Sequence, residues 1–80
     1  MEITIRDIIE LLINKQYKQL RATLENMYPY EIAALFNELN KEYVPVAFRL
    51  LPKELAAETF VEMDSDAQEL LIKSFSDSEL

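Results

Sequence analysis

The sequence predicts an all-α fold, a superhelical stack of about six short helices that forms a single domain over residues 1–80. Three observations support this prediction. The apolar residues recur at intervals of three and four, which is the period of a helix and not of a strand. The chain contains no glycine, so the Asn-Gly and Asp-Gly pairs that favour tight hairpins are absent. Its prolines fall where helices are expected to begin.

Six apolar stripes define the predicted helices. In chain order they are Ile5-Ile8-Ile9-Leu12, Tyr17-Leu20-Leu24-Met27, Ile32-Leu35-Phe36-Leu39, Val44-Ala47-Phe48-Leu51, Leu55-Thr59-Phe60-Met63 and Ala67-Leu70-Leu71-Phe75. Helices of about ten residues are only marginally stable alone, so packing between them must hold the fold together.

The three prolines mark helix starts. We expect Pro29 and Pro52 at the first helical position, where the missing N–H has no intrahelical partner anyway. Pro45 must lie in the first turn of the fourth helix, because a position deeper inside would cost about 3 kcal/mol.

Polar residues predict the helix caps. Thr4, with Asp7 three residues later, resembles a weakened capping box before the first stripe. Further caps are expected from Asp64 or Ser65 for the sixth helix, and from Ser76 or Asp77 for a seventh helix that the chain only begins.

The chain also repeats itself. The segment Pro29–Ala34 matches Pro52–Ala57 at an offset of 23 residues, and a further four residues match at 24. The segment Ser76–Leu80 opens like a third copy. Each unit is a helix pair, which is typical of a superhelical stack, and we expect the chain to be the first part of a longer domain.

Several repeated residues are predicted to lie in the core. Small side chains let neighbouring helices approach, so we expect the pairs Ala33-Ala34 and Ala56-Ala57 at helix contacts. Phe48 and Phe60 occupy matching stripe positions and are expected to anchor the core, so truncation of either to alanine should cost about 3–5 kcal/mol.

The composition argues against several classes of partner and of function. The formal net charge is −7, from 15 acidic and 8 basic residues, which argues against nucleic acid and anionic membrane as partners and is compatible with cations. No apolar run approaches about 18 residues, so we expect no direct membrane insertion. The absence of histidine, cysteine and a glycine-rich loop argues against an enzyme and against zinc or iron.

An acidic ladder stands out in the fifth predicted helix. Glu54, Glu58 and Glu62 follow one another at steps of four, so each is rotated by only about 40° and all three share one edge. None has a Lys or Arg three or four residues away, although like charges at this spacing are destabilising. One interpretation is a solvated face, and the other is a surface whose repulsion a divalent cation relieves. Asp64 and Asp66 are interpreted as helix-capping acids.

These residues resemble a known family. The segments Leu50–Glu58 and Ser76–Leu80, with Asp64, Gln68 and Leu71 between them, resemble the cytosolic N-terminal domain of MgtE-type magnesium transporters. Upstream, Pro29–Ala33 followed by Leu39 fits the preceding turn of that domain. The resemblance covers about residues 8–80, and the flagellar motor switch protein FliG has a similar helical domain.

The resemblance implies a Mg²⁺-sensing regulatory domain on the cytoplasmic side of the cell membrane. In the family, acidic residues of this domain face a CBS-domain pair across a Mg²⁺-stabilised interface that closes the transmembrane pore. Glu58 falls on the glutamate after the Ala-Ala pair and is the implied metal residue, whereas Glu54 and Glu62 are candidates from spacing only. Mg²⁺ keeps several waters and uses few carboxylates, so weak regulatory binding is expected. The alternative is a FliG-like helical-repeat module for protein interaction.

Overall fold

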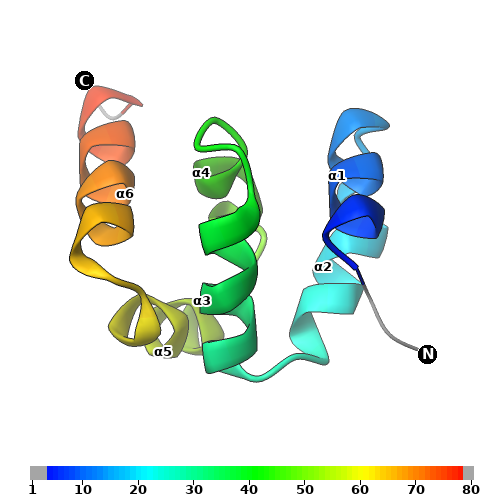
Figure 1. The fold of residues 1–80 in the computed structure, drawn as a ribbon, viewed down its shortest axis with the longest axis horizontal. Coiled ribbons are helices and arrows are strands. Elements are labelled where there is room, and N and C mark those ends of the chain that lie inside the picture. The colour runs from blue at the N-terminus through cyan, green and yellow to red at the C-terminus, as the bar shows by residue number, and fades with distance from the viewer. Residues whose placement is uncertain (1–3, 79–80) are drawn as a thin grey trace.

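The computed structural model describes residues 4–78 and confirms the all-α prediction (Figure 1). The described residues form six helices and no strand. The helices are α1 (Ile5–Ile13), α2 (Tyr17–Glu25), α3 (Pro29–Glu38), α4 (Val44–Arg49), α5 (Lys53–Glu62) and α6 (Ser65–Ser78).

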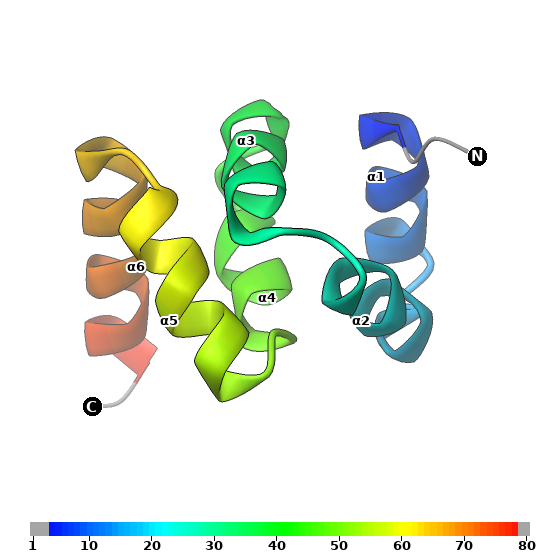
Figure 2. The same cartoon turned by 90° about the horizontal axis from the view of Figure 1, so that it is seen from below.

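The helices stack along the long axis of a molecule that measures 37 × 24 × 21 Å. α1 packs on α2 at one end, α3 and α4 occupy the middle, and α5 and α6 lie at the other end (Figures 1 and 2). α3 packs against α5, and α4 packs against α6. Each helix of one repeat unit therefore contacts its counterpart in the next unit, which is the stacking that the sequence repeat predicts.

Two predicted proline positions are confirmed and one is wrong. Pro29 is the first residue of α3, and Pro45 lies in the first turn of α4. Pro52, however, precedes α5 as its N-cap, with an extended backbone at φ −57° and ψ 151°. Its carbonyl accepts a hydrogen bond from the Ala56 amide at 2.8 Å, which is the bond that an N-cap carbonyl makes with the first turn.

Side-chain caps fix the starts of α1 and α6. The Thr4 amide donates to Asp7 Oδ2 at 3.1 Å, and the Asp7 amide donates to Thr4 Oγ1 at 3.3 Å, so the capping box is complete. Of the two candidates for α6, Asp64 is the cap, because its Oδ1 accepts from the Ala67 amide at 2.9 Å. Asp66 lies inside the first turn of α6, where its negative charge interacts favourably with the helix dipole but the side chain is not the cap.

The predicted caps of a seventh helix are not at a helix start. Ser76 and Asp77 lie within α6, which continues through Ser78, and residues 79–80 lie outside the described part of the chain. Phe75, the residue before them, packs onto the core from α6.

The turn between α1 and α2 forms without glycine. The Gln16 amide donates to the Leu11 carbonyl at 2.9 Å and the Lys15 amide donates to the Leu12 carbonyl at 3.1 Å, which is a Schellman motif. Such a motif needs one residue in the left-handed backbone conformation, and this residue is usually glycine. Here Lys15 adopts that conformation, at φ 56°. This conformation costs a non-glycine residue roughly 1–2 kcal/mol.

The core follows the predicted stripes. Every stripe residue is buried or half-buried except Tyr17, which is 37% exposed. The prediction for the alanine pairs is only half correct. Ala33 is buried and Ala56 is half-buried, but Ala34 and Ala57 are exposed. Adjacent helical residues point about 100° apart, so one member of each pair turns away from the contact.

The four phenylalanines meet at Phe48. Its ring centroid lies 6.5 Å from Phe36, 6.3 Å from Phe60 and 5.9 Å from Phe75, so α4 links α3, α5 and α6. The Arg49 guanidinium lies 5.0 Å from the Phe75 centroid and adds a cation–π contact. Phe48 and Phe60 both pack on the core as predicted, but both are half-buried.

Among residues 4–78, one buried side-chain polar atom has no hydrogen-bond partner. Thr59, on α5, is fully buried, and its Oγ1 makes no hydrogen bond within the described residues. An unpaired buried hydroxyl costs about 1–3 kcal/mol. By contrast, Thr23 Oγ1 donates to the Gln19 carbonyl at 3.1 Å.

We predict that Phe48→Ala lowers the free energy of unfolding by about 3 kcal/mol, the lower end of the range for phenylalanine truncation because the ring is half-buried. Phe60→Ala should cost less, since Phe60 contacts one ring of the cluster and Phe48 contacts three. Urea denaturation measures both values, with Tyr30→Ala at a 61% exposed ring as the control. Equal losses at all three positions would refute the central role of Phe48.

We predict that Thr59→Val raises the free energy of unfolding by about 1 kcal/mol, because it removes an unpaired hydroxyl without changing the shape of the side chain. The melting temperature should rise by about 4–8 °C for a domain of this size. Thr23→Val is the matched control and should not stabilise, because Thr23 loses a hydrogen bond. A Thr59→Val protein that melts below the parent contradicts the prediction.

Candidate functional site

The acidic ladder lies along α5, as its spacing predicts. Glu54 is in the first turn, Glu62 is the last residue of the helix, and Glu58 lies between them. All three side chains are exposed, and none makes an ion pair with another residue among those described. Glu54 is favoured by the dipole at the start of the helix, but Glu62 faces the negative end.

The ladder shares its surface with apolar side chains. Ala57 and Val61 are exposed on α5 at positions three residues after Glu54 and Glu58, and Val61 is 75% exposed. We call Glu54, Ala57, Glu58, Val61 and Glu62 the outer face of α5. This face combines three carboxylates with an apolar strip, and only the carboxylates were predicted from residue spacing.

The geometry of the outer face does not form a closed metal site. Glu54 and Glu62 are eight residues apart, about 12 Å along the helix axis, so the three carboxylates cannot all share one Mg²⁺. Within the described residues, no group of three or more acidic side chains is placed to hold a metal ion. The outer face can therefore offer single carboxylates, or water-mediated contacts, to an ion that another surface also binds.

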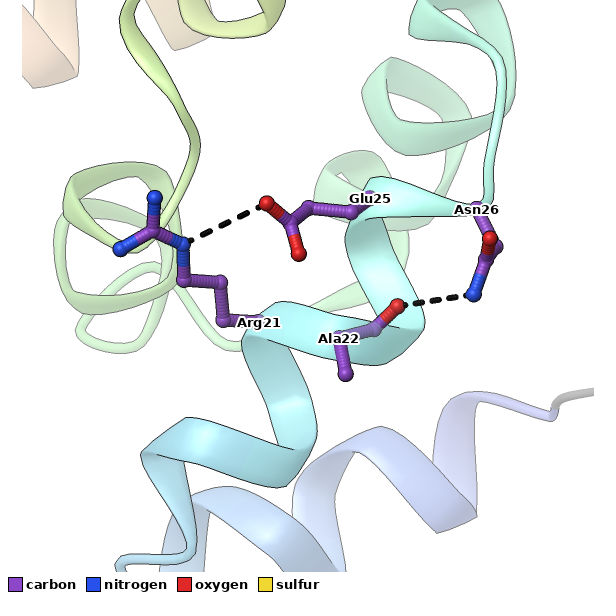
Figure 3. A network of polar contacts seen from close by, with 4 residues as sticks. All are labelled: Arg21, Ala22, Glu25 and Asn26. Atoms are coloured by element: carbon purple, nitrogen blue, oxygen red, sulfur yellow. Dashed lines mark hydrogen bonds and ion pairs between the residues drawn. The ribbon is translucent and has the colours of Figure 1, made fainter.

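The other charges of the molecule show why the ladder is unusual. Two acids elsewhere in the molecule form ion pairs with a base four residues away: Arg21 Nε lies 3.6 Å from Glu25 Oε2 (Figure 3), and Lys73 Nζ lies 4.0 Å from Glu69 Oε1. Figure 3 also shows the Asn26 side chain donating to the Ala22 carbonyl, at 3.0 Å, at the end of the same helix. The acids of α5 have no base at this spacing in the sequence.

The net charge is concentrated in one part of the molecule. Residues 1–28 carry four acids and four bases, so their net charge is zero. Residues 29–80 carry eleven acids and four bases, which accounts for the whole charge of −7. The ladder therefore belongs to the strongly acidic part of the chain, where added cations relieve repulsion beyond α5 itself.

Two residues of the family-like motif have structural roles. Asp64 caps α6, and Gln68 Nε2, one turn into α6, donates to the Phe60 carbonyl at 2.6 Å. The second bond adds a donor to the Phe60 carbonyl, which also accepts from the Met63 amide at 3.2 Å, so a side chain of α6 caps the end of α5 while Asp64 in the connection caps the start of α6. Sequence reasoning identified Gln68 only as part of a motif, because its partner lies eight residues away on another helix.

A groove lies between the α3–α4 connection and the start of α6. Its volume is about 440 Å³, with Phe36, Leu39, Val44 and Leu70 among its apolar lining residues. Charges of both signs line it as well, among them Lys41, Asp66, Glu69 and Lys73. The groove contains none of the ladder residues, and no stripe or motif in the sequence predicted it.

No helix among the described residues is long and apolar enough to cross a membrane. The model of one protein family, described as MgtE intracellular N domain, matches residues 27–80. The match begins just before α3 and so covers both helix pairs of the repeat, including the ladder. A search of curated proteins found no match to the chain.

We predict that Gln68→Leu lowers the free energy of unfolding by about 1 kcal/mol, because it removes a part-buried hydrogen bond and leaves the Phe60 carbonyl only the 3.2 Å bond from the Met63 amide. Urea denaturation provides the measurement. Gln19→Leu on the exposed face of α2 is the control, and it should change stability by less than about 0.5 kcal/mol. If the two variants unfold at the same urea concentration, the bond from Gln68 to the end of α5 contributes nothing.

Proposed function

Because the chain belongs to the MgtE intracellular N domain family, we propose that it is the cytosolic regulatory domain of a magnesium transporter. The family match over both helix pairs is the main support for this assignment. The domain itself does not conduct ions. It acts from the cytoplasmic side of the membrane on a pore elsewhere in the same transporter.

The proposed mechanism is charge relief at an interface. Glu58, with Glu54 and Glu62 beside it, faces a CBS-domain pair of the same transporter. The observation that carries the proposal is that these acids form no ion pair within the described part of the chain. A divalent cation, when bound, supplies positive charge between the two surfaces. The carboxylates are the hard oxygen donors that Mg²⁺ prefers, and their separation suits weak, partly hydrated binding.

The acidic ladder then acts as a switch through its own repulsion. At low Mg²⁺ the ladder repels an acidic partner and the interface opens. At high Mg²⁺ the repulsion is neutralised, the interface forms and the pore closes. The chain contributes one side of this site, because within the described residues no three acids come together.

A second function is supported by the apolar part of the outer face. Val61 is 75% exposed beside Glu58, and Ala57 is exposed on the same helix. Such a strip suits a protein partner that packs on α5, in the manner of a helical-repeat interaction module. This function would not depend on Mg²⁺, so the response to Mg²⁺ distinguishes the two.

We predict that Mg²⁺ raises the melting temperature of the chain more than NaCl does at matched ionic strength, and that Glu58→Gln removes most of the excess. At about tenfold its Kd a ligand stabilises by only about 1.4 kcal/mol, so a gain of a few degrees is expected. In the full transporter, Glu58→Gln should leave the pore more open at high Mg²⁺, because a closing contact is lost.

Glu25→Gln is the matched control, since Glu25 is also exposed but already pairs with Arg21. It should keep the Mg²⁺ excess. If Mg²⁺ and NaCl shift the melt equally, and the Glu58→Gln transporter closes at the parental Mg²⁺ concentration, then the ladder is a solvated face and the interaction module is the better description.

A further inference from the structure

The turn between α1 and α2 carries charge of the opposite sign to the outer face of α5. From residue 11 to residue 24 the chain has three bases, Lys15, Lys18 and Arg21, and no acid. Arg21 pairs with Glu25, but Lys15 and Lys18 are exposed and make no ion pair with any other described residue.

Apolar side chains lie beside these lysines. Ile13 is 61% exposed and Tyr17 is 37% exposed, and a shallow hollow is lined by Lys15, Tyr17 and Lys18 among others. We call Ile13, Lys15, Tyr17 and Lys18 the α1–α2 tip. The left-handed backbone at Lys15 makes this turn tight, so the four side chains are presented within one short connection.

The tip and the outer face of α5 are complementary. Each combines exposed apolar side chains with charges that no other described residue pairs, and the charges have opposite sign. α5 and the α1–α2 turn lie in different halves of a molecule that is 37 Å long, with α3 and α4 towards its middle (Figures 1 and 2). The tip therefore cannot reach the α5 helix of its own chain, and a contact between the two surfaces must join two molecules.

We propose that the outer face of α5 binds the α1–α2 tip of a second copy of this chain, head to tail. Tyr17 and Ile13 would cover the exposed Val61, while Lys15 and Lys18 would pair with Glu58 and Glu62. The two patches differ, so the contact is heterologous and leads to open chains of copies and not to a closed dimer. The proposal does not depend on the proposed Mg²⁺ response, although both use Glu58.

A second copy fits the tip better than an anionic membrane does. A bilayer surface would attract Lys15 and Lys18 but repel the acidic remainder of the chain, which carries the whole net charge of −7. A second copy offers the tip three carboxylates beside the exposed Val61 on one helix, whereas a bilayer surface is charged over its whole area and so also repels the acidic parts of the chain next to the tip. Repulsion between two molecules of charge −7 opposes the contact at long range, but at about 0.15 M salt the screening length is about 8 Å, much shorter than the molecule.

The proposal is tested by sedimentation velocity of the 80-residue chain without Mg²⁺, at about 0.15 M NaCl, from about 10 μM to 1 mM. The parent should self-associate with a dissociation constant on the order of 10⁻⁴ M, as small interfaces do. Lys18→Glu should weaken the association about tenfold, because it places an acid against the ladder. The double variant, Lys18→Glu with Glu58→Lys, should return to within about threefold of the parent.

Glu58→Lys alone is the decisive variant. It adds two positive charges and brings the net charge from −7 to −5, so general repulsion falls and association would strengthen if net charge alone governed it. The proposal requires the reverse, about a tenfold weakening, because Lys15 and Lys18 of one copy would then meet a positive charge at position 58 of the next copy.

Lys41→Glu is the matched control, at an exposed lysine that forms no ion pair with any described residue. It changes the net charge by the same amount as Lys18→Glu but lies outside both proposed contact surfaces. It should change the association less than about threefold, an amount that charge alone explains.

Four results overturn the proposal. They are a parent that stays monomeric to about 1 mM, a Glu58→Lys protein that associates more tightly, a double variant that is not rescued, and equal effects of Lys18→Glu and Lys41→Glu. A separate experiment measures binding of the parent and of Lys18→Glu to vesicles with about 30% anionic lipid. If Lys18→Glu abolishes vesicle binding and leaves self-association in sedimentation unchanged, the α1–α2 tip is a membrane-binding patch and does not bind a second copy. Circular dichroism melts confirm that each variant is folded.

Discussion

The part of the fold that carries the repeat depends on packing between helices two places apart in the chain, α3 on α5 and α4 on α6. The helices are short, from 6 residues in α4 to 14 in α6, and helices of this length are unstable in isolation. α3 is held by α5 and α4 by α6, with Phe48 as the residue that all the other phenylalanine rings approach. The shortest helix thus carries the most connected side chain, and it orders the helices on both sides of it.

This packing lets the two repeat units differ in their polar residues. Glu31 and Glu54 occupy matching positions in the repeat, and Glu31 accepts a hydrogen bond from the Tyr28 amide at 2.9 Å. The residue that matches Tyr28 in the second unit is Leu51, whose amide already donates to the Phe48 carbonyl at 3.1 Å. A side chain that caps α3 therefore has no equivalent partner in α5, and Glu54 remains available on the outer face.

Much of the structure could be predicted from residue spacing, because the period of the apolar side chains shows which face of each helix is buried. The same spacing placed Glu54, Glu58 and Glu62 on one exposed edge, although their metal role stays a prediction. Contacts between helices were not predictable in this way. The centrality of Phe48, the Gln68 bond to the Phe60 carbonyl and the exposure of Ala34 depend on how the helices meet, which the local sequence does not specify.

The outer face of α5 shows how a surface can be unfavourable by itself and still be maintained. Repulsion within the ladder weakens α5, and the Thr59 hydroxyl, which no described residue pairs, adds a second cost. Contact with α3 along its inner side and the Gln68 bond at its end offset these costs without neutralising the ladder. The three carboxylates are thus held on an ordered helix while their charge stays unsatisfied. Any partner that supplies positive charge, whether an ion or a lysine, meets a surface that needs no rearrangement before it binds.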